Sequence, residues 1–341
     1  MGTDKGRALR LLVALWLCLS SLPLAGQQRL SVDHQAGREV VNDWTRAFLT
    51  HVFEVDHERR RIYVAEVGEP GLVVAFSIAD GTVVGTYGRG RGDGPGEVRN
   101  MVQDVAAANG GLLVSDGLRV NYWTVAADSA WTWNPGLNFA KYVCAMGDDP
   151  VVPLLHGALR GPGGARLGAG QRPLQDAGRS RSLLAADGVC FDDMAYFIAE
   201  GTIVGHSTAG ESITVPVPPE VAEAVTEWRA SRPDGGRYTS SYRSLSHDGQ
   251  GHLVLTFVNH MRLEFAAAII DPATGCYSLL VDESRERHRS IMGVHGDSAI
   301  VYERGVSVRQ INGRRTRVIE PEAFMIALRP LRPAGGSPCA R

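Results

Sequence analysis

The amino-acid sequence predicts an all-β protein that closes into a β-propeller of six four-stranded blades, with one short inserted helix. Three features predict this fold: abundant glycine, a repeated unit of turn and strand, and a second turn inside most units. The chain has 341 residues, of which 40 are glycine and 17 are proline. Glycine at this frequency, beside short apolar runs, is typical of many tight turns between strands rather than of helix packing.

A polar turn followed by a short apolar strand occurs six times. Anchor residues of the six strands are Ile62, Leu112, Val151, Tyr196, Leu253 and Ile300. The steps between them are 50, 39, 45, 57 and 47 residues, which brackets the repeat of roughly 40–50 residues that propeller blades have. The longest step contains 218–228, where prolines precede apolar residues at helical spacing. We therefore expect an inserted helix there.

Most units contain a second turn, which predicts a second hairpin. Ala79-Asp80-Gly81 lies between two apolar runs of the first unit, and Asn312-Gly313 lies between two runs of the last. With the apolar run before each first turn, this makes about four antiparallel strands per unit, as in a propeller blade. The third unit is the exception, because 157–179 has little strand character. We expect a long loop in place of part of that blade, and a count of seven blades is the alternative.

The N-terminal 26 residues predict export. A positively charged start is followed by an apolar run, Leu11 to Leu24, and by the small residues Ala25-Gly26. This order is that of a secretory signal peptide; an N-terminal membrane anchor is the alternative. The next residue is Gln27, where a lipoprotein needs cysteine. The mature protein is therefore expected to be periplasmic or extracellular, without a lipid anchor and without a later membrane span.

The remainder of the chain divides into three parts. Residues 27–45 are expected to supply a strand that closes the ring on the last blade. Residues 46–325 form the propeller domain. Residues 326–341, which are rich in proline and glycine after Pro330, are expected to be a flexible tail.

The cysteines predict one disulfide. After removal of the signal peptide four cysteines remain, which allow three pairings. Cys144 and Cys190 occupy similar places in neighbouring repeats, so they are the expected pair. No Cys-x-x-Cys or clustered histidine accompanies them, so a metal site is not predicted there.

A glycine-rich segment carries a family resemblance. Residues 88–98, Gly-Arg-Gly-Arg-Gly-Asp-Gly-Pro-Gly-Glu-Val, resemble the Gly-x-Gly-Pro-Gly-Glu-Phe segment of bacterial exported six-bladed propellers related to the NHL-repeat group, with Val98 in place of the aromatic residue. The strands Ile62-Tyr-Val-Ala-Glu66 and Leu112-Leu-Val-Ser-Asp116 resemble that group's Ile-Tyr-Val-x-Asp strand. The resemblance implies a six-bladed fold and an exported location more than an activity.

The same segment supplies the candidate ligand-binding residues. It joins one blade to the next, and such links lie near the mouth of the propeller channel. Arg89, Arg91, Asp93 and Glu97 would there contact a ligand or pair among themselves. We favour pairing, since charged side chains on tight turns are commonly solvated or locally bonded.

The function predicted from these features is binding without catalysis. The net charge is −2 and the arginines are scattered, which does not indicate a nucleic-acid binder. Neither Gly-x-Ser-x-Gly nor His-Glu-x-x-His occurs, so serine-hydrolase and zinc-protease functions lack support. We expect a monomer without a cofactor that binds a protein or a small molecule through its channel-mouth loops.

The alternative is a metal-dependent, lactonase-like hydrolase with its site at the propeller axis. It requires a divalent cation such as calcium, held by several oxygen ligands. Asp104, Asn121 and Asn259 are candidate ligands. A further set of acids recurs at the ends of the second strands, and we expect it to be structural rather than a ring around a cation: Glu66, Asp116, Glu200 and Glu303.

Overall fold

The computed structural model describes most of the chain after the N-terminal segment. The described residues are 27–43, 48–66, 71–124, 130–135, 142–154, 157–161, 165–167, 187–199, 202–231, 242–257, 265–282, 289–311 and 313–336. The signal-peptide prediction, at residues 1–26, lies outside them. No helix in the described part is long and apolar enough to cross a bilayer.

The described strands form six units of four antiparallel strands, so the predicted all-β propeller is confirmed. Blade one contains β3 (Phe48–Asp56), β4 (Arg61–Glu66), β5 (Val73–Ser77) and β6 (Val83–Tyr87). Blade two contains β7 (Asp104–Ala107), β8 (Gly111–Ser115), β9 (Val120–Thr124) and β10 (Ala130–Trp133). Blade three contains β11 (Cys144–Met146), β12 (Asp149–Leu154), β13 (Gly157–Arg160) and β14 (Ala165–Leu167).

The remaining blades follow the same order from the axis outward. Blade four contains β15 (Gly188–Phe191), β16 (Met194–Ala199), β17 (Thr202–Ser207) and β18 (Ser212–Val215). Blade five contains β19 (Tyr242–His247), β20 (Leu253–Phe257), β21 (Phe265–Ile270) and β22 (Tyr277–Val281). Blade six contains β23 (Arg289–His295), β24 (Ser298–Ile311), β25 (Arg314–Gly336) and, from the other end of the chain, β2 (Arg38–Asp43).

The N-terminal strands join the two ends of the chain. β2 pairs antiparallel with β25, so that residues from the start of the chain provide the outer strand of the last blade. β1 (Gln27–Val32) pairs parallel with β22 of blade five and antiparallel with the end of β25. The ring is therefore closed by backbone hydrogen bonds between segments about 300 residues apart, and β1 links blades five and six into one continuous sheet.

The hydrophobic core is divided into six clusters, one between each pair of neighbouring blades. Val98, Tyr63 and Trp123 belong to the cluster between blades one and two, and Val40 and Ile326 belong to the one between blades six and one. The other four clusters fill the remaining gaps. Each blade hides both faces against its neighbours, which is why the repeat must continue around a closed ring.

The predicted insertion is a helix. α3 (Pro219–Ala230) lies in the connection between blades four and five. It begins at a proline, which lacks the N–H that a first helical turn leaves unpaired, and Glu220 follows in that turn. Val221 and Val225 pack into the cluster between these two blades.

Two expectations about individual segments were wrong. Blade three has all four strands, because β13 and β14 form short hairpin strands where a long loop was expected; residues 168–186 lie outside the described part. Residues 326–336 are not a flexible tail, since they belong to β25 and pair with β24, β2 and β1. Proline was the misleading signal, because pairing of this segment with β24, β2 and β1 outweighs its low strand propensity.

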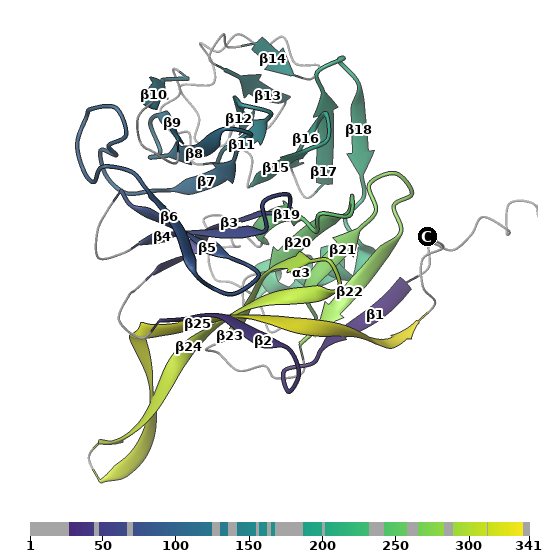
Figure 1. The fold of residues 1–341 in the computed structure, drawn as a ribbon. Helices are drawn as coiled ribbons and strands as arrows, with labels where there is room; N and C mark the ends of the chain where they lie inside the picture. Colours follow the sequence, from purple (N-terminus) through teal and green to yellow (C-terminus); the bar gives the residue numbers. More distant parts are fainter. Residues whose placement is uncertain are drawn as a thin grey trace, which may run out of the picture.

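The alternating strand direction defines two faces of the ring. The links between blades and the β8–β9 turn lie on one face, which we call the mouth face. The β3–β4 turn and its equivalents lie on the opposite face. Figure 1 shows the long β24–β25 hairpin extending away from the ring.

Candidate functional site

The glycine-rich segment folds into a compact loop on the mouth face, which we call the mouth loop (residues 88–101). Arg89 N–H donates to the Gly96 carbonyl at 2.9 Å, and Val98 N–H donates to the Gly90 carbonyl at 3.1 Å. Gly88 has a φ of 100°, and a side chain there would meet the Gly71 carbonyl oxygen. Only glycine fits this corner. Val98 is fully buried between blades one and two. Its aliphatic side chain fills the core there, in the place of the aromatic residue of the segment that it resembles.

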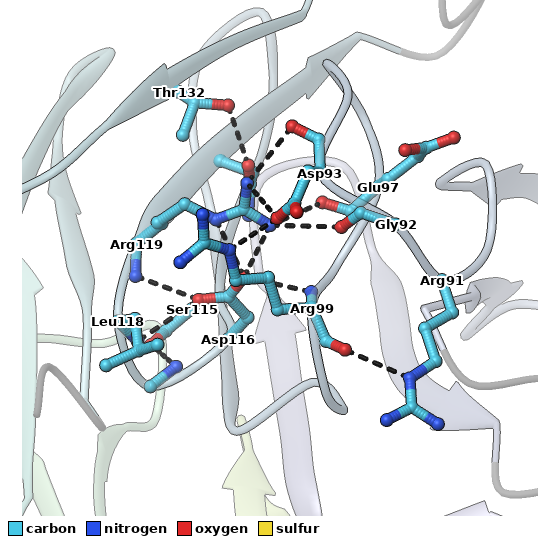
Figure 2. A network of polar contacts seen from close by, with 12 residues as sticks. Arg91, Gly92, Asp93, Glu97, Arg99, Ser115, Asp116, Leu118, Arg119 and Thr132 are labelled. Atoms are coloured by element: carbon cyan, nitrogen blue, oxygen red, sulfur yellow. Dashed lines mark hydrogen bonds and ion pairs between the residues drawn. The ribbon is translucent and has the colours of Figure 1, made fainter.

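A buried arginine holds the mouth loop from below (Figure 2). Arg119 lies in the β8–β9 turn and is 7% exposed. Its guanidinium donates to the Asp93 carbonyl at 3.2 Å, the Gly92 carbonyl at 3.3 Å and the Glu97 carbonyl at 3.4 Å. One rigid side chain thus bonds three backbone positions of the loop, and the fixed fork of the guanidinium suits this role.

Asp116 neutralises the buried arginine. Its carboxylate accepts from Nε and a terminal nitrogen of Arg119 at 3.0 and 2.8 Å, and also from the Arg99 N–H at 3.2 Å. Burial acts to raise the pKa of Asp116, but hydrogen bonds from Arg119 and backbone amides outweigh it and lower the pKa below its usual value. This acid of the repeated set is therefore structural, as expected. Glu303 is likewise paired, with Arg289 at 3.2 Å.

The four predicted ligand residues divide into two kinds. Asp93 is paired with the side chain of Arg99, and Glu97 accepts the Gly94 N–H at 2.7 Å, so both acids are bonded within the loop. Arg89 and Arg91 are exposed. Arg91 also donates from Nε to the Arg99 carbonyl at 3.0 Å, which sets the direction of its side chain.

The mouth loop leads into a cavity on the propeller axis. The cavity has a volume of about 80 Å³ and is lined by the first strands of all six blades. Asp104 begins β7 directly after the loop, and it lines the cavity together with Glu54, Asp187 and Tyr142. Three carboxyl groups from three blades therefore converge on the axis.

Each axial carboxyl group is bonded to the backbone of the next blade along the ring. Asp104 accepts the N–H of Val143, before β11, at 2.9 Å. Asp187 accepts the N–H of Leu245, in β19, at 2.8 Å. Glu54 interacts in the same way with the backbone of Ala107 in β7. These acids thus connect blades one to two, two to three and four to five.

The position of the axial acids favours their neutral forms. Glu54 and Asp104 keep some surface open to the cavity but lie deep inside the ring. Burial raises the pKa of Glu54 to about 8, and the nearby charges of Asp56 and Asp187 act in the same direction. Burial and Asp187 likewise raise the pKa of Asp104 well above its ordinary value. A proton or a cation in the cavity would relieve this repulsion.

The metal ligands predicted from the sequence do not converge. Asp104 lines the cavity, but Asn121 lies on the third strand of blade two, where it accepts a hydrogen bond from Thr132 at 2.9 Å. Asn259 lies outside the described residues. Within the described ranges no group of three His, Cys, Asp or Glu side chains has a geometry that holds a metal ion. Sequence reasoning missed Glu54 and Asp187, and for Glu54 the available signal was an acid inside an apolar first strand, Phe53-Glu54-Val55.

Cys144 and Cys190, the pair expected from the repeat, are joined in a disulfide with Cα atoms 5.3 Å apart. They lie on β11 and β15, the first strands of blades three and four, and both line the axial cavity. The disulfide thus connects blades three and four. Among the described residues, the axial carboxyl groups bridge the gaps on either side of this pair but not the pair itself.

Three histidines meet on the opposite face. His57 donates from Nε2 to the His247 carbonyl at 2.9 Å, so its Nδ1 is the acceptor for the proton on Nδ1 of His295, at 2.9 Å. Burial lowers the pKa of His57 to about 3, and the other two histidines act in the same direction. Neutral His57 therefore connects blades one, five and six.

Comparisons with known proteins support the fold. No family model matches the chain, and no curated protein matches it. Among solved structures, that of U3-55K has a TM-score of 0.50 at 10% identity, covering 87% of this chain and all of the other. The WD40 repeats of RRP9 have a TM-score of 0.49 at 10% identity, covering 89% of this chain and all of the other. At this identity the similarity to U3-55K shows the propeller fold alone.

Proposed function

We propose that this chain is an exported, non-catalytic β-propeller of the NHL-related kind that binds a protein or small-molecule partner through its mouth loop. The observation that carries the proposal is the buried Arg119, which bonds three carbonyl groups of an otherwise exposed loop. A loop that is ordered before binding loses little conformational entropy when the partner docks. Its rigidity thus supports recognition.

The charges of the mouth loop favour an anionic group on the partner. Asp93 and Glu97 are bonded within the loop, and the side chains of Arg89 and Arg91 reach its exposed surface. Planar guanidinium groups bind carboxylate and phosphate through paired hydrogen bonds. The partner would therefore place a carboxylate or phosphate between these two arginines.

The test uses affinity capture from the medium in which the protein acts, followed by titration of each captured candidate. The variant is Arg89→Glu with Arg91→Glu, and the control is Arg29→Glu, an exposed arginine of β1. We expect a partner that binds the wild type and the control but binds the double variant about tenfold more weakly or worse. A partner that binds all three proteins equally would contradict the proposal.

A second candidate function is a cation-dependent hydrolase at the axis. The convergence of Glu54, Asp104 and Asp187 on one cavity favours it, because hard cations bind carboxylate oxygens. The hydrogen bond from each acid to a neighbouring blade favours the structural role instead.

Calcium titration separates these two roles of the axial acids. In a structural role, calorimetry with Ca²⁺ shows no saturable heat, and Asp104→Asn lowers stability without any change in cation binding. Stoichiometric Ca²⁺ binding that Asp104→Asn abolishes, together with calcium-dependent turnover of a lactone, would establish the hydrolase.

A further inference from the structure

The end of the β24–β25 hairpin extends beyond the propeller. β23 pairs with β24 over residues 298–303, and β2 pairs with β25 over residues 324–328. From Gly305↔Glu320 to Ile311↔Arg314, the described strands pair with each other alone. Figure 1 shows this part, which we call the arm (residues 304–320), standing away from the ring.

The arm is strongly basic on an acidic protein. Residues 304–320 contain five arginines and one glutamate, a net charge of +4, whereas the whole chain has a net charge of −2. Three of the arginines lie within four positions of β25: Arg314, Arg315 and Arg317. The side chains of Arg309, Arg314 and Arg315 are exposed. Positive charge is therefore concentrated on a segment that extends away from the ring.

No described strand pairs with the outer edges of the arm. Residues beside a two-residue turn form a hydrogen-bonded pair, and such pairs alternate with non-bonded ones along the hairpin. With Ile311 opposite Arg314, the residues of β25 that direct N–H and C=O groups outward are 315, 317 and 319. A two-stranded hairpin is only marginally stable by itself in water, and a third strand would satisfy these groups.

We propose that the arm is a docking site for an extended acidic segment of a partner protein, which adds as a third strand along the β25 edge. Backbone hydrogen bonds would supply affinity, and carboxylates flanking the arginines would supply selectivity. A second copy of this chain fits less well, because two arms of like charge repel each other. The proposal does not depend on the mouth loop.

The test measures binding of a fluorescent synthetic peptide of alternating glutamate and threonine, roughly eight residues long, to the whole protein by anisotropy. Ile319→Pro removes an outward N–H of β25, while Val308→Pro removes an outward N–H on the β24 edge. We expect Ile319→Pro to weaken binding about tenfold or more and Val308→Pro to leave it unchanged. Reversal of three charges, Arg314→Glu with Arg315→Glu and Arg317→Glu, should weaken it similarly, which tests the proposal even where Ile319→Pro does not fold.

Control ligands separate strand addition from simple charge attraction. A peptide with proline in place of threonine keeps the charge but cannot pair as a strand, so it should bind at least about tenfold more weakly. Equal binding of that peptide would overturn the proposal. So would tighter binding to polyphosphate or anionic lipid vesicles than to the first peptide, an arm-dependent dimer in sedimentation, or no peptide binding at all. Arg89→Glu with Arg91→Glu should not affect this binding, so failure here leaves the mouth-loop proposal standing.

Discussion

Single buried side chains determine the form of the exposed surface in this protein. Arg119 shows this most directly, because one guanidinium bonds three carbonyl groups of the mouth loop and a carboxylate beneath it. A surface loop with so many glycines would otherwise sample many conformations. The conformation of the exposed loop residues is thus held by Arg119, which is itself buried beneath them.

Loss of Arg119 should cost both stability and loop order. Arg119→Met would leave Asp116, which is 2% exposed, without its main partner, and breaking a buried pair costs about 3–5 kcal/mol. Denaturant unfolding should show this loss, and hydrogen exchange should speed up across residues 89–98. The exposed Arg91→Met is the control, with an expected change below about 0.5 kcal/mol. Unchanged exchange in the loop would contradict the anchoring role.

The raised pKa of Glu54 predicts a pH dependence of stability. The folded-state pKa is about 8, above the ordinary value of 4.5, so the folded state favours the protonated form. The contribution of protonated Glu54 to the stability of the folded state is fully present below pH 4.5 and is lost as pH rises through 8. Between pH 5 and 8 the free energy of unfolding of the wild type should fall by on the order of 2 kcal/mol more than that of Glu54→Gln, as measured by denaturant unfolding. Parallel pH profiles of the two proteins would show that Glu54 is ionised in the folded state.

At the level of elements, neighbouring blades are tied in more than one way. Apolar clusters fill each gap between blades, but apolar contacts do not fix the exact rotation of one sheet against another. Directional bonds on the first strands do so: the axial carboxyl groups at three gaps and a disulfide at the gap between blades three and four. The axis is therefore where blade orientation is set.

The disulfide should contribute measurably to stability. Cys144 and Cys190 are 46 residues apart, and a loop of that length corresponds to about 4 kcal/mol in the chain-entropy model. Replacing both cysteines with alanine should lower the free energy of unfolding by an amount of this order. Adding a reductant to the wild type should lower its free energy of unfolding by a similar amount. The same reductant should change the unfolding transition of the double alanine variant much less. Equal stability of wild type and variant would show that the blades do not need the covalent link.

At the level of the whole molecule, the chain ends decide whether the ring closes. β2 supplies the outer strand of blade six, and its Val40 and Val41 are buried between blades six and one. β1 adds a second junction between blades five and six. A propeller without this closure would leave strand edges and apolar surface exposed.

Removal of residues 27–43 should therefore open the ring. The loss of two buried valines alone corresponds to at least about 3 kcal/mol, so we expect a lower melting temperature and a broader transition. A synthetic peptide of residues 27–43 should bind the shortened protein and restore the melting temperature. An unchanged transition after truncation would mean that the remaining strands close the ring by themselves.

Prediction from sequence succeeded where local pattern was sufficient. The six turn-and-strand units and the inserted helix at 218–228 follow from periodicity and turn residues, and the structure confirms them. It failed where proline and glycine obscured the strand pattern, as in β13, β14 and the end of β25. At those places pairing with distant segments outweighed local propensity.

The sequence by itself determined the six turn-and-strand units, the place of the inserted helix, and that the apolar faces of the units need neighbours of the same kind. Only the tertiary structure decided which side chains meet: that Glu54, Asp104 and Asp187 share the axis, and that Arg119 of the neighbouring blade holds the mouth loop. The physical reason is that turn and strand formation depend on neighbours in sequence. Convergence on an axis instead depends on the rotation of every blade against the next, which no local pattern encodes.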